Sequence, residues 1–102
     1  MIYSNVSFLV APGKNLDANE YFHTVTRQVK KITGHDVRIL QQLAGPMGHF
    51  VLLSTYDTLA EWDQARTQLQ NDTPFQKLVA QAGNDGLFIP GEVKSSIWQQ
   101  LQ

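Results

Sequence analysis

The chain contains no cysteine among its 102 residues. This absence excludes disulfide bonds, thiolate nucleophiles and zinc sites with cysteine ligands. Long apolar runs are missing as well, and residues 1–13 alternate polar with apolar side chains, so we expect neither a membrane span nor a signal peptide. The length corresponds to one domain, residues 1–102, and the simplest expectation for its location is the cytoplasm.

A strong charge of one sign is also absent. The net charge is −1, from eight basic and nine acidic residues. Proteins that bind nucleic acids usually carry a basic stripe that replaces the counterions of the phosphates. Here the basic pair Lys30-Lys31 falls in the last turn of an expected helix, where cations interact favourably with the helix dipole. We therefore expect no nucleic-acid partner.

The sequence motifs of several large enzyme classes are missing. There is no Gly-x-Ser-x-Gly elbow, no P-loop and no Gly-x-Gly-x-x-Gly fingerprint. The three histidines, His23, His35 and His49, show no i, i+4 pairing of the kind that holds a metal. We expect His23 to face solvent on a helix and His35 to lie in a loop. The sequence thus predicts neither a metal nor a cofactor.

The hydrophobic fraction of 42% and the charged fraction of 17% are ordinary for a globular protein. A domain of this size buries only about 60–70% of the surface of its unfolded chain. One compact core is possible at that size, but a deep private cavity is not. We therefore expect any sizeable ligand pocket to be shared with a second subunit.

Hydrophobic periodicity predicts four strands, over residues 2–10, 37–44, 49–56 and 92–101. In the first strand, one face carries Ile2, Val6, Phe8 and Val10 with Ser4, and the other face carries Tyr3, Asn5, Ser7 and Leu9. The third strand is the most apolar, so we expect it to be central. A hairpin through the Gly-Pro turn at residues 45–46 connects the second strand to the third.

Helices are expected between these strands. Asp17 and Glu20 resemble a capping box, Leu16 and Tyr21 a hydrophobic staple, and Gly34 ends the first helix. Thr58 and Glu61 form a second capping box. A third helix starts at Thr73, with Pro74 at its first helical position, so the second helical region breaks near residues 71–72. In the second helix, Trp62 is expected to be a core residue.

Four motifs carry a resemblance to a known family. They are Val10-Ala11-Pro12-Gly13-Lys14, the Gly45-Pro46 turn, Tyr56-Asp57-Thr58-Leu59-Ala60-Glu61, and Asn71-Asp72-Thr73-Pro74-Phe75-Gln76-Lys77-Leu78. Their order and spacing resemble the dimeric α/β-barrel superfamily, and within it the NIPSNAP-type domains. The resemblance spans nearly the whole chain and implies an α+β, ferredoxin-like βαββαβ domain with an antiparallel sheet.

The resemblance also implies an assembly. In this superfamily two subunits place their sheets face to face, forming a barrel with helices outside. Members include cofactor-independent monooxygenases, haem-degrading monooxygenases, muconolactone isomerases and peroxidase-like enzymes, and the NIPSNAP branch has no common reaction, so fold alone does not fix function. Haem degradation is disfavoured, because Tyr56 stands where those members have a tryptophan and residues 59–70 contain no histidine.

Two residues are candidates for catalysis. His49 begins the third strand at the expected mouth of the barrel, where it is either a general base that lines a pocket or an ordinary histidine at a strand end. Tyr56 ends the same strand and is the other candidate for handling a proton.

Five residues are candidates for binding a substrate. Tyr3, Asn5 and Ser7 form a polar row that either orients a ligand in the barrel or belongs to a partly solvated sheet face. Arg38 either pairs with an anionic ligand or is a charge at the rim. Trp98 is a core residue, a dimer contact or a stacking surface for a ligand.

Two functions remain open from the sequence. In the first, a homodimer binds a small apolar or aromatic molecule and acts on it without a cofactor, as a monooxygenase or an isomerase. In the second, the homodimer is a structural or interaction protein whose barrel is filled by its own side chains. Tyr3, Phe50, Tyr56 and Trp98 are the large residues available for filling it.

Overall fold

The computed structural model describes residues 1–102 and contains four strands and three helices. In chain order they are β1 (Ile2–Leu9), α1 (Asn15–Thr33), β2 (Arg38–Gln41), β3 (His49–Tyr56), α2 (Leu59–Gln70), α3 (Thr73–Asn84) and β4 (Lys94–Gln99). No helix is both long enough and apolar enough to cross a membrane.

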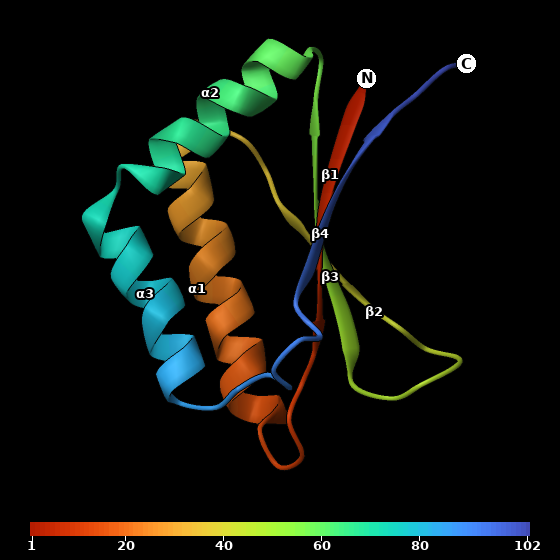
Figure 1. Cartoon of the computed structure of the whole chain (residues 1–102), viewed down its shortest axis with the longest axis vertical. Helices are drawn as coiled ribbons and strands as arrows, with labels where there is room; N and C mark the ends of the chain where they lie inside the picture. The colour runs from red at the N-terminus through yellow and green to blue at the C-terminus, as the bar shows by residue number, and fades with distance from the viewer.

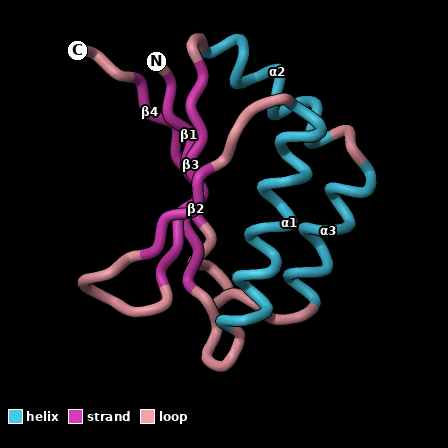
Figure 2. The backbone as a smooth tube through the Cα atoms, turned by 180° about the vertical axis from the view of Figure 1, so that it is seen from behind, coloured by secondary structure: helices cyan, strands magenta, loops and turns pink.

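The four strands form one antiparallel sheet in the order β2-β3-β1-β4. This is the ferredoxin-like arrangement that the sequence predicts, with the two central strands β1 and β3 paired along their whole length. All three helices lie on one side of the sheet (Figure 1). The view from behind shows the same two layers, with the β2–β3 loop and the C-terminus on the helix-free side (Figure 2).

The core lies between the helices and one face of the sheet. Successive side chains of a strand point to opposite faces, and β1 therefore directs Ile2 and Phe8 toward the helices, where both are buried. Phe22 of α1 is fully buried against the face of strands β1 and β3, with its ring centroid 5.3 Å from that of Phe8 and 5.1 Å from that of Phe50. The predicted division of the β1 side chains between the two faces of the sheet is confirmed.

The ends of the helices follow from local sequence. Gly34 adopts a left-handed conformation at φ 78° and closes α1 by donating its N–H to the Lys30 carbonyl. Thr58 caps α2 by accepting a hydrogen bond from the Glu61 N–H at 3.2 Å, as predicted. The predicted break between α2 and α3 is also confirmed. The N-cap residue of α3, however, is Asp72 and not Thr73, the N-cap that the sequence predicts. The Asp72 side chain accepts a hydrogen bond from the Phe75 N–H at 2.8 Å.

The predicted start of α1 is wrong. The helix begins at Asn15, its N-cap residue is Lys14, and no side chain caps it. Leu16 is 87% exposed, so it forms no hydrophobic staple with Tyr21. A capping pattern names residues that can cap a helix, but the tight turn at Ala11–Lys14 already fixes where this helix begins, since the Lys14 N–H binds the Ala11 carbonyl.

Two strands are shorter than predicted. β2 covers residues 38–41 rather than 37–44, because the chain turns away through a loop in which Gly45 and Gly48 have positive φ angles. β4 begins at Lys94 rather than at Glu92, because a turn at Pro90-Gly91 precedes it and the Glu92 N–H binds the Ile89 carbonyl.

The central position of Phe22 makes it the residue on which core stability depends most. Replacing it with alanine removes a fully buried ring, and core Phe→Ala substitutions cost about 3–5 kcal/mol of unfolding free energy. We expect a loss of that size for Phe22→Ala in urea denaturation. His23→Ala, at the exposed neighbouring position, should change stability by less than about 0.5 kcal/mol. Similar losses for both variants would contradict this account of the core.

Tyr21 gives the fold a pH dependence. Burial raises the pKa of its hydroxyl above the ordinary value of 10.0. The folded state then holds this proton more tightly than the unfolded state, so stability is complete below pH 10.0 and is lost as pH rises through the folded pKa. We expect unfolding free energy, measured in urea at about pH 9 and about pH 11, to fall more for the wild type than for Tyr21→Phe. Equal falls for the wild type and Tyr21→Phe would contradict the assignment.

Candidate functional site

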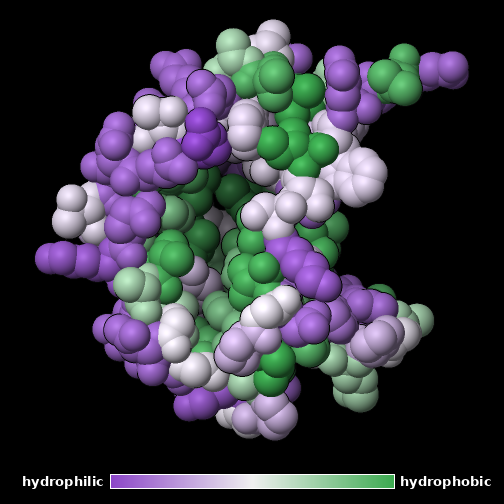
Figure 3. All heavy atoms as spheres, viewed as in Figure 1, coloured by the Kyte–Doolittle hydropathy of each residue, from purple (hydrophilic) through white to green (hydrophobic).

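The face of the sheet that no helix covers is the candidate site, and we call it the open face. Alternation along the paired strands places these side chains on it: Tyr3, Asn5, Ser7, Leu9, Arg38, Leu40, His49, Val51, Leu53, Thr55, Lys94, Ser96 and Trp98. In the space-filling view this side of the molecule is hollowed between the C-terminal tail and the β2–β3 loop (Figure 3).

The strand register arranges the open face in rows that cross the sheet. The middle row runs Arg38, Leu53, Asn5, Ser96 from β2 to β4. The next row toward the β2–β3 loop contains Leu40, Val51, Ser7 and Lys94 in the same order. Each row thus combines polar with apolar side chains, which is the mixture that small-molecule sites use for orientation and affinity.

The polar side chains of the open face differ in whether they already form a hydrogen bond within the chain. The Tyr3 hydroxyl donates to Oε1 of Gln100 at 2.8 Å, and the Ser7 hydroxyl donates to the Lys94 carbonyl at 3.4 Å. No hydrogen bond within the chain engages the side chain of Asn5 or of His49. These two side chains are therefore free to bind a ligand or a partner.

The site residues predicted from sequence are only partly brought together. His49 pairs with Leu9 across the strands, whereas Tyr3 pairs with Thr55 at the other end of β3. At a rise of about 3.4 Å per residue, His49 lies roughly 20 Å along the sheet from Tyr3 and roughly 13 Å from the row of Asn5. Ser7 lies between them. Within one copy, one small ligand cannot contact both Tyr3 and His49.

Tyr56 lies outside the open face. It is 6% exposed and packs with Ile2 and Ala65 on the helix-covered side of the sheet. Its ring lies 4.6 Å from the ring of His35, which is in the loop after α1, as predicted. Phe50 is also on the helix side, against Phe22. This position removes Tyr56 from the candidate site and removes both residues from the set that could fill a barrel.

Arg38 lies at the edge of the open face, beside a depression of about 220 Å³. The depression is lined by Gly34, His35, Asp36, Arg38, Leu53, Ser54 and Thr55. Asp36 is paired with Lys30, whose Nζ lies 3.2 Å from its Oδ1, and no ion pair involves Arg38. Arg38 is thus a cation without a counter-charge at the end of the middle row.

Trp98 lies on the open face and is 60% exposed, opposite Tyr3 in the register. It is therefore not a core residue in this chain, which leaves a dimer contact or a stacking surface for a ligand. Trp62, by contrast, packs against the cluster of Ile2, Tyr56 and Ala65, with the Arg66 guanidinium 5.3 Å from its ring centroid. Trp62 is partly buried and packs at the border of this cluster, so the predicted core position is confirmed only in part.

A second hollow lies on the helix side, between α1 and α3. It has a volume of about 430 Å³ and is lined by Lys14, Asp17, Glu20, Tyr21, Thr24, Leu78, Gln81, Ala82, Asp85 and Leu87. Gln81 Nε2 already donates to Asp85 Oδ1 at 2.8 Å.

No group of three or more His, Cys, Asp or Glu side chains in the chain is placed to hold a metal ion. His23 faces solvent on α1, as predicted.

Sequence reasoning missed part of the open face. Leu40, Val51, Leu53 and Lys94 line it, and none of them was a candidate. For β3 the reason is that apolar residues occupy both faces, so alternation alone cannot say which face the helices cover. The signal that resolves it is the pairing register, since Asn5 and Leu53 are directly opposite.

No protein-family model matches the sequence, and a comparison with curated proteins also finds no match. Solved structures do match. A NIPSNAP domain protein from Burkholderia xenovorans superposes with a TM-score of 0.78 at 14% identity, covering 98% of this chain and 94% of that chain. A NIPSNAP family protein from Agrobacterium tumefaciens gives 0.77 at 15% identity, covering 96% and 90%.

A candidate antibiotic biosynthesis monooxygenase from Nitrosomonas europaea gives a TM-score of 0.73 at 18% identity and covers all of both chains. At these identities the similarity concerns the fold. It confirms at that level the resemblance that the sequence motifs indicate. The chain therefore has the ferredoxin-like fold that NIPSNAP proteins share with monooxygenase-type proteins of the same architecture.

Proposed function

We propose that this protein forms a homodimer through its open face and binds a small, largely apolar molecule in the barrel between the two sheets. The observation that supports the proposal is the composition of the open face. It carries Leu9, Leu40, Val51, Leu53 and Trp98 around unoccupied polar side chains, and no helix covers it. A second copy of the same face is the partner we propose, because two identical faces can pair about a two-fold axis.

The dimensions of the sheet are consistent with this partner. The four strands are about 4.8 Å apart; β1 and β3 have eight residues each, β2 has four and β4 has six, so the sheet presents roughly 420 Å² in projection. A stable interface buries about 800 Å² per partner. The β2–β3 loop and the C-terminal tail supply further contact area, because Leu43 and Met47 in the loop and Leu101 in the tail are about nine-tenths exposed. All three lie on segments that extend to the helix-free side (Figure 2).

Asn5 is the residue we propose to hold the ligand. Its amide is central on the open face and unoccupied, and it can donate to or accept from an oxygen of the ligand. Ser7 and Ser96 flank it, and Leu53 and Val51 supply the apolar wall. Trp98 and Tyr3 lie in the next row of the sheet, on the side away from the β2–β3 loop, and offer aromatic surface for stacking.

For a reaction, we propose cofactor-independent oxygenation by dioxygen, or isomerisation, of an activated substrate; in the oxygenation the substrate itself supplies the two electrons that reduce the second oxygen atom to water. The support is the fold shared with candidate monooxygenases and the presence on the open face of His49, a residue type that serves as a general base. Because His49 lies roughly 13 Å along the sheet from Asn5 in the same copy, it would exchange a proton with the part of the ligand farthest from Asn5. Loss of turnover in His49→Ala with retained ligand binding would support this step.

A non-enzymatic assembly protein is the second candidate. It is favoured because no group of titratable side chains converges on the open face, where Arg38, His49 and Lys94 lie in three different rows. Trp98 and Tyr3 are large enough to occupy part of the barrel, although Phe50 and Tyr56 lie on the other side of the sheet. A dimer that binds no apolar molecule would favour this second function.

The assembly is tested by a charge placed in the centre of the open face. Val51→Lys adds an ammonium group that dimerisation would bury without a counter-charge, which costs several kcal/mol. We expect this variant to be a folded monomer in light scattering after size exclusion, with the circular dichroism of the wild type. Val79→Lys makes the same change on the outer surface of α3 and should remain a dimer. Dimers of both variants would contradict assembly through the open face.

Ligand binding is tested with 2-naphthol, a neutral aromatic molecule with one hydroxyl group. We expect it to bind the wild-type dimer in isothermal titration calorimetry. Asn5→Ala removes one hydrogen bond, so its affinity should fall about two- to tenfold. Asn19→Ala, on the exposed surface of α1, should bind as the wild type does. Equal affinities for the two variants would remove Asn5 from the site.

A further inference from the structure

The charges of this chain are distributed unevenly between the sheet and the rest of the molecule. All nine acidic residues lie in helices or loops, and none lies in a strand. The strands contain two charged residues, Arg38 and Lys94, and both are basic. Register places both on the open face. The charged residues that the strands place on this face are therefore both basic, although the chain has a net charge of −1.

The two cations differ in how far they are neutralised. The Lys94 Nζ lies 3.8 Å from Oε2 of Glu92, a long and partly exposed ion pair. Arg38 has no ion pair and no side-chain hydrogen bond within the chain. The nearest acidic residue in sequence, Asp36, is paired with Lys30. Arg38 is thus the charge that the fold leaves without a partner.

Closing a barrel over this face has a consequence for Arg38. A cation that is removed from water without a counter-charge is strongly unfavourable. Two copies would bring two such guanidinium groups to the rim of one cavity, and no strand of the second copy contains a carboxylate. A bound molecule with a negative charge would supply a counter-charge for Arg38.

We propose that the ligand of the open face is an apolar molecule with one carboxylate group, and that Arg38 binds this carboxylate. The inference rests on the proposed function, because it names the chemical class of ligand for the same site. The guanidinium group is a planar fork that matches the two oxygens of a carboxylate. Leu53 separates Arg38 from Asn5 in the middle row, so the apolar body of the ligand lies over Leu53 with a second polar group at Asn5.

The surroundings favour a single negative charge over a phosphate. Sites for phosphate dianions combine several cations with backbone N–H groups at a helix N-terminus. In the middle row, Arg38 is followed by neutral side chains only, those of Leu53, Asn5 and Ser96. The adjoining depression of about 220 Å³ is lined by Arg38 and by Asp36, whose carboxylate is paired with Lys30, and it provides room beside the guanidinium group.

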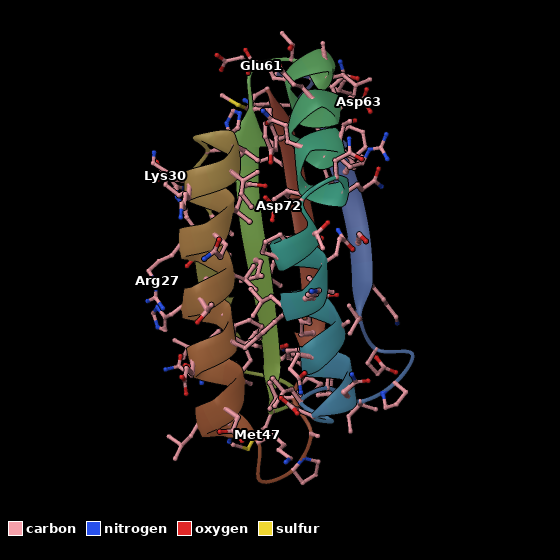
Figure 4. All side chains as sticks on the ribbon, turned by 90° about the vertical axis from the view of Figure 1, so that its left-hand side faces the viewer. Arg27, Lys30, Met47, Glu61, Asp63 and Asp72 are labelled. Carbon is pink, nitrogen blue, oxygen red and sulfur yellow. The ribbon has the colours of Figure 1, made fainter.

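The experiment compares two probes of the same shape, 2-naphthoate and 2-naphthamide, by isothermal titration calorimetry with the full chain. We expect the wild type to bind the acid about ten- to hundredfold more tightly than the amide, as a charge-assisted hydrogen-bond pair predicts. Arg38→Gln should abolish this preference, because the affinity for the acid should fall about ten- to hundredfold. Arg27→Gln is the matched control, since Arg27 projects from the outer side of α1 (Figure 4), and it should keep the preference.

The outcomes separate this inference from the proposed function. Equal binding of acid and amide by the wild type would overturn the role of Arg38 and leave the apolar site intact. A preference that survives in Arg38→Gln would likewise overturn it. Binding of neither probe by a dimer would overturn the carboxylate ligand and the binding function together. A preference lost in Arg38→Gln alone supports the inference.

Discussion

The helices bury one face of the sheet and leave the other without a covering layer, and the remaining features follow from this one-sided burial. Phe22 of α1 packs between Phe8 and Phe50 and fixes which residues of β1 and β3 face inward. Because neighbouring residues of a strand point to opposite sides, the same contact directs Asn5, Val51 and Leu53 outward. A sheet face with this many apolar side chains is stable in water when something covers it.

The fold could be predicted from the sequence because the sequence signals of its helices and strands are local and mutually consistent. Alternation in residues 2–9, the left-handed Gly34 and the Thr58–Glu61 cap each specify one element, and together they leave few topologies. The errors lie at element ends. Asp17 and Thr73 have the chemistry of helix caps, but turn geometry and the neighbouring Asp72 decide where the helices begin.

The candidate site could be predicted less fully from the sequence, for a physical reason. β3 is apolar on both faces, so nothing in its own sequence shows that Tyr56 lies under α2 while Leu53 lies on the open face. That assignment depends on its pairing with β1, which is a long-range property. The polar row of Tyr3, Asn5 and Ser7 could be found because β1 does alternate. The distance between His49 and Tyr3 could not be predicted, since it depends on the pairing register of β1 with β3.

The central claim is that a second copy of the chain covers the open face, and native mass spectrometry of the protein as purified tests it most directly. We predict a species with twice the chain mass of 11.5 kDa. Additional mass on that species would also deliver the bound molecule for identification. A stable monomer at the same concentrations would contradict the claim, because the open face would then remain in water and no shared cavity would exist.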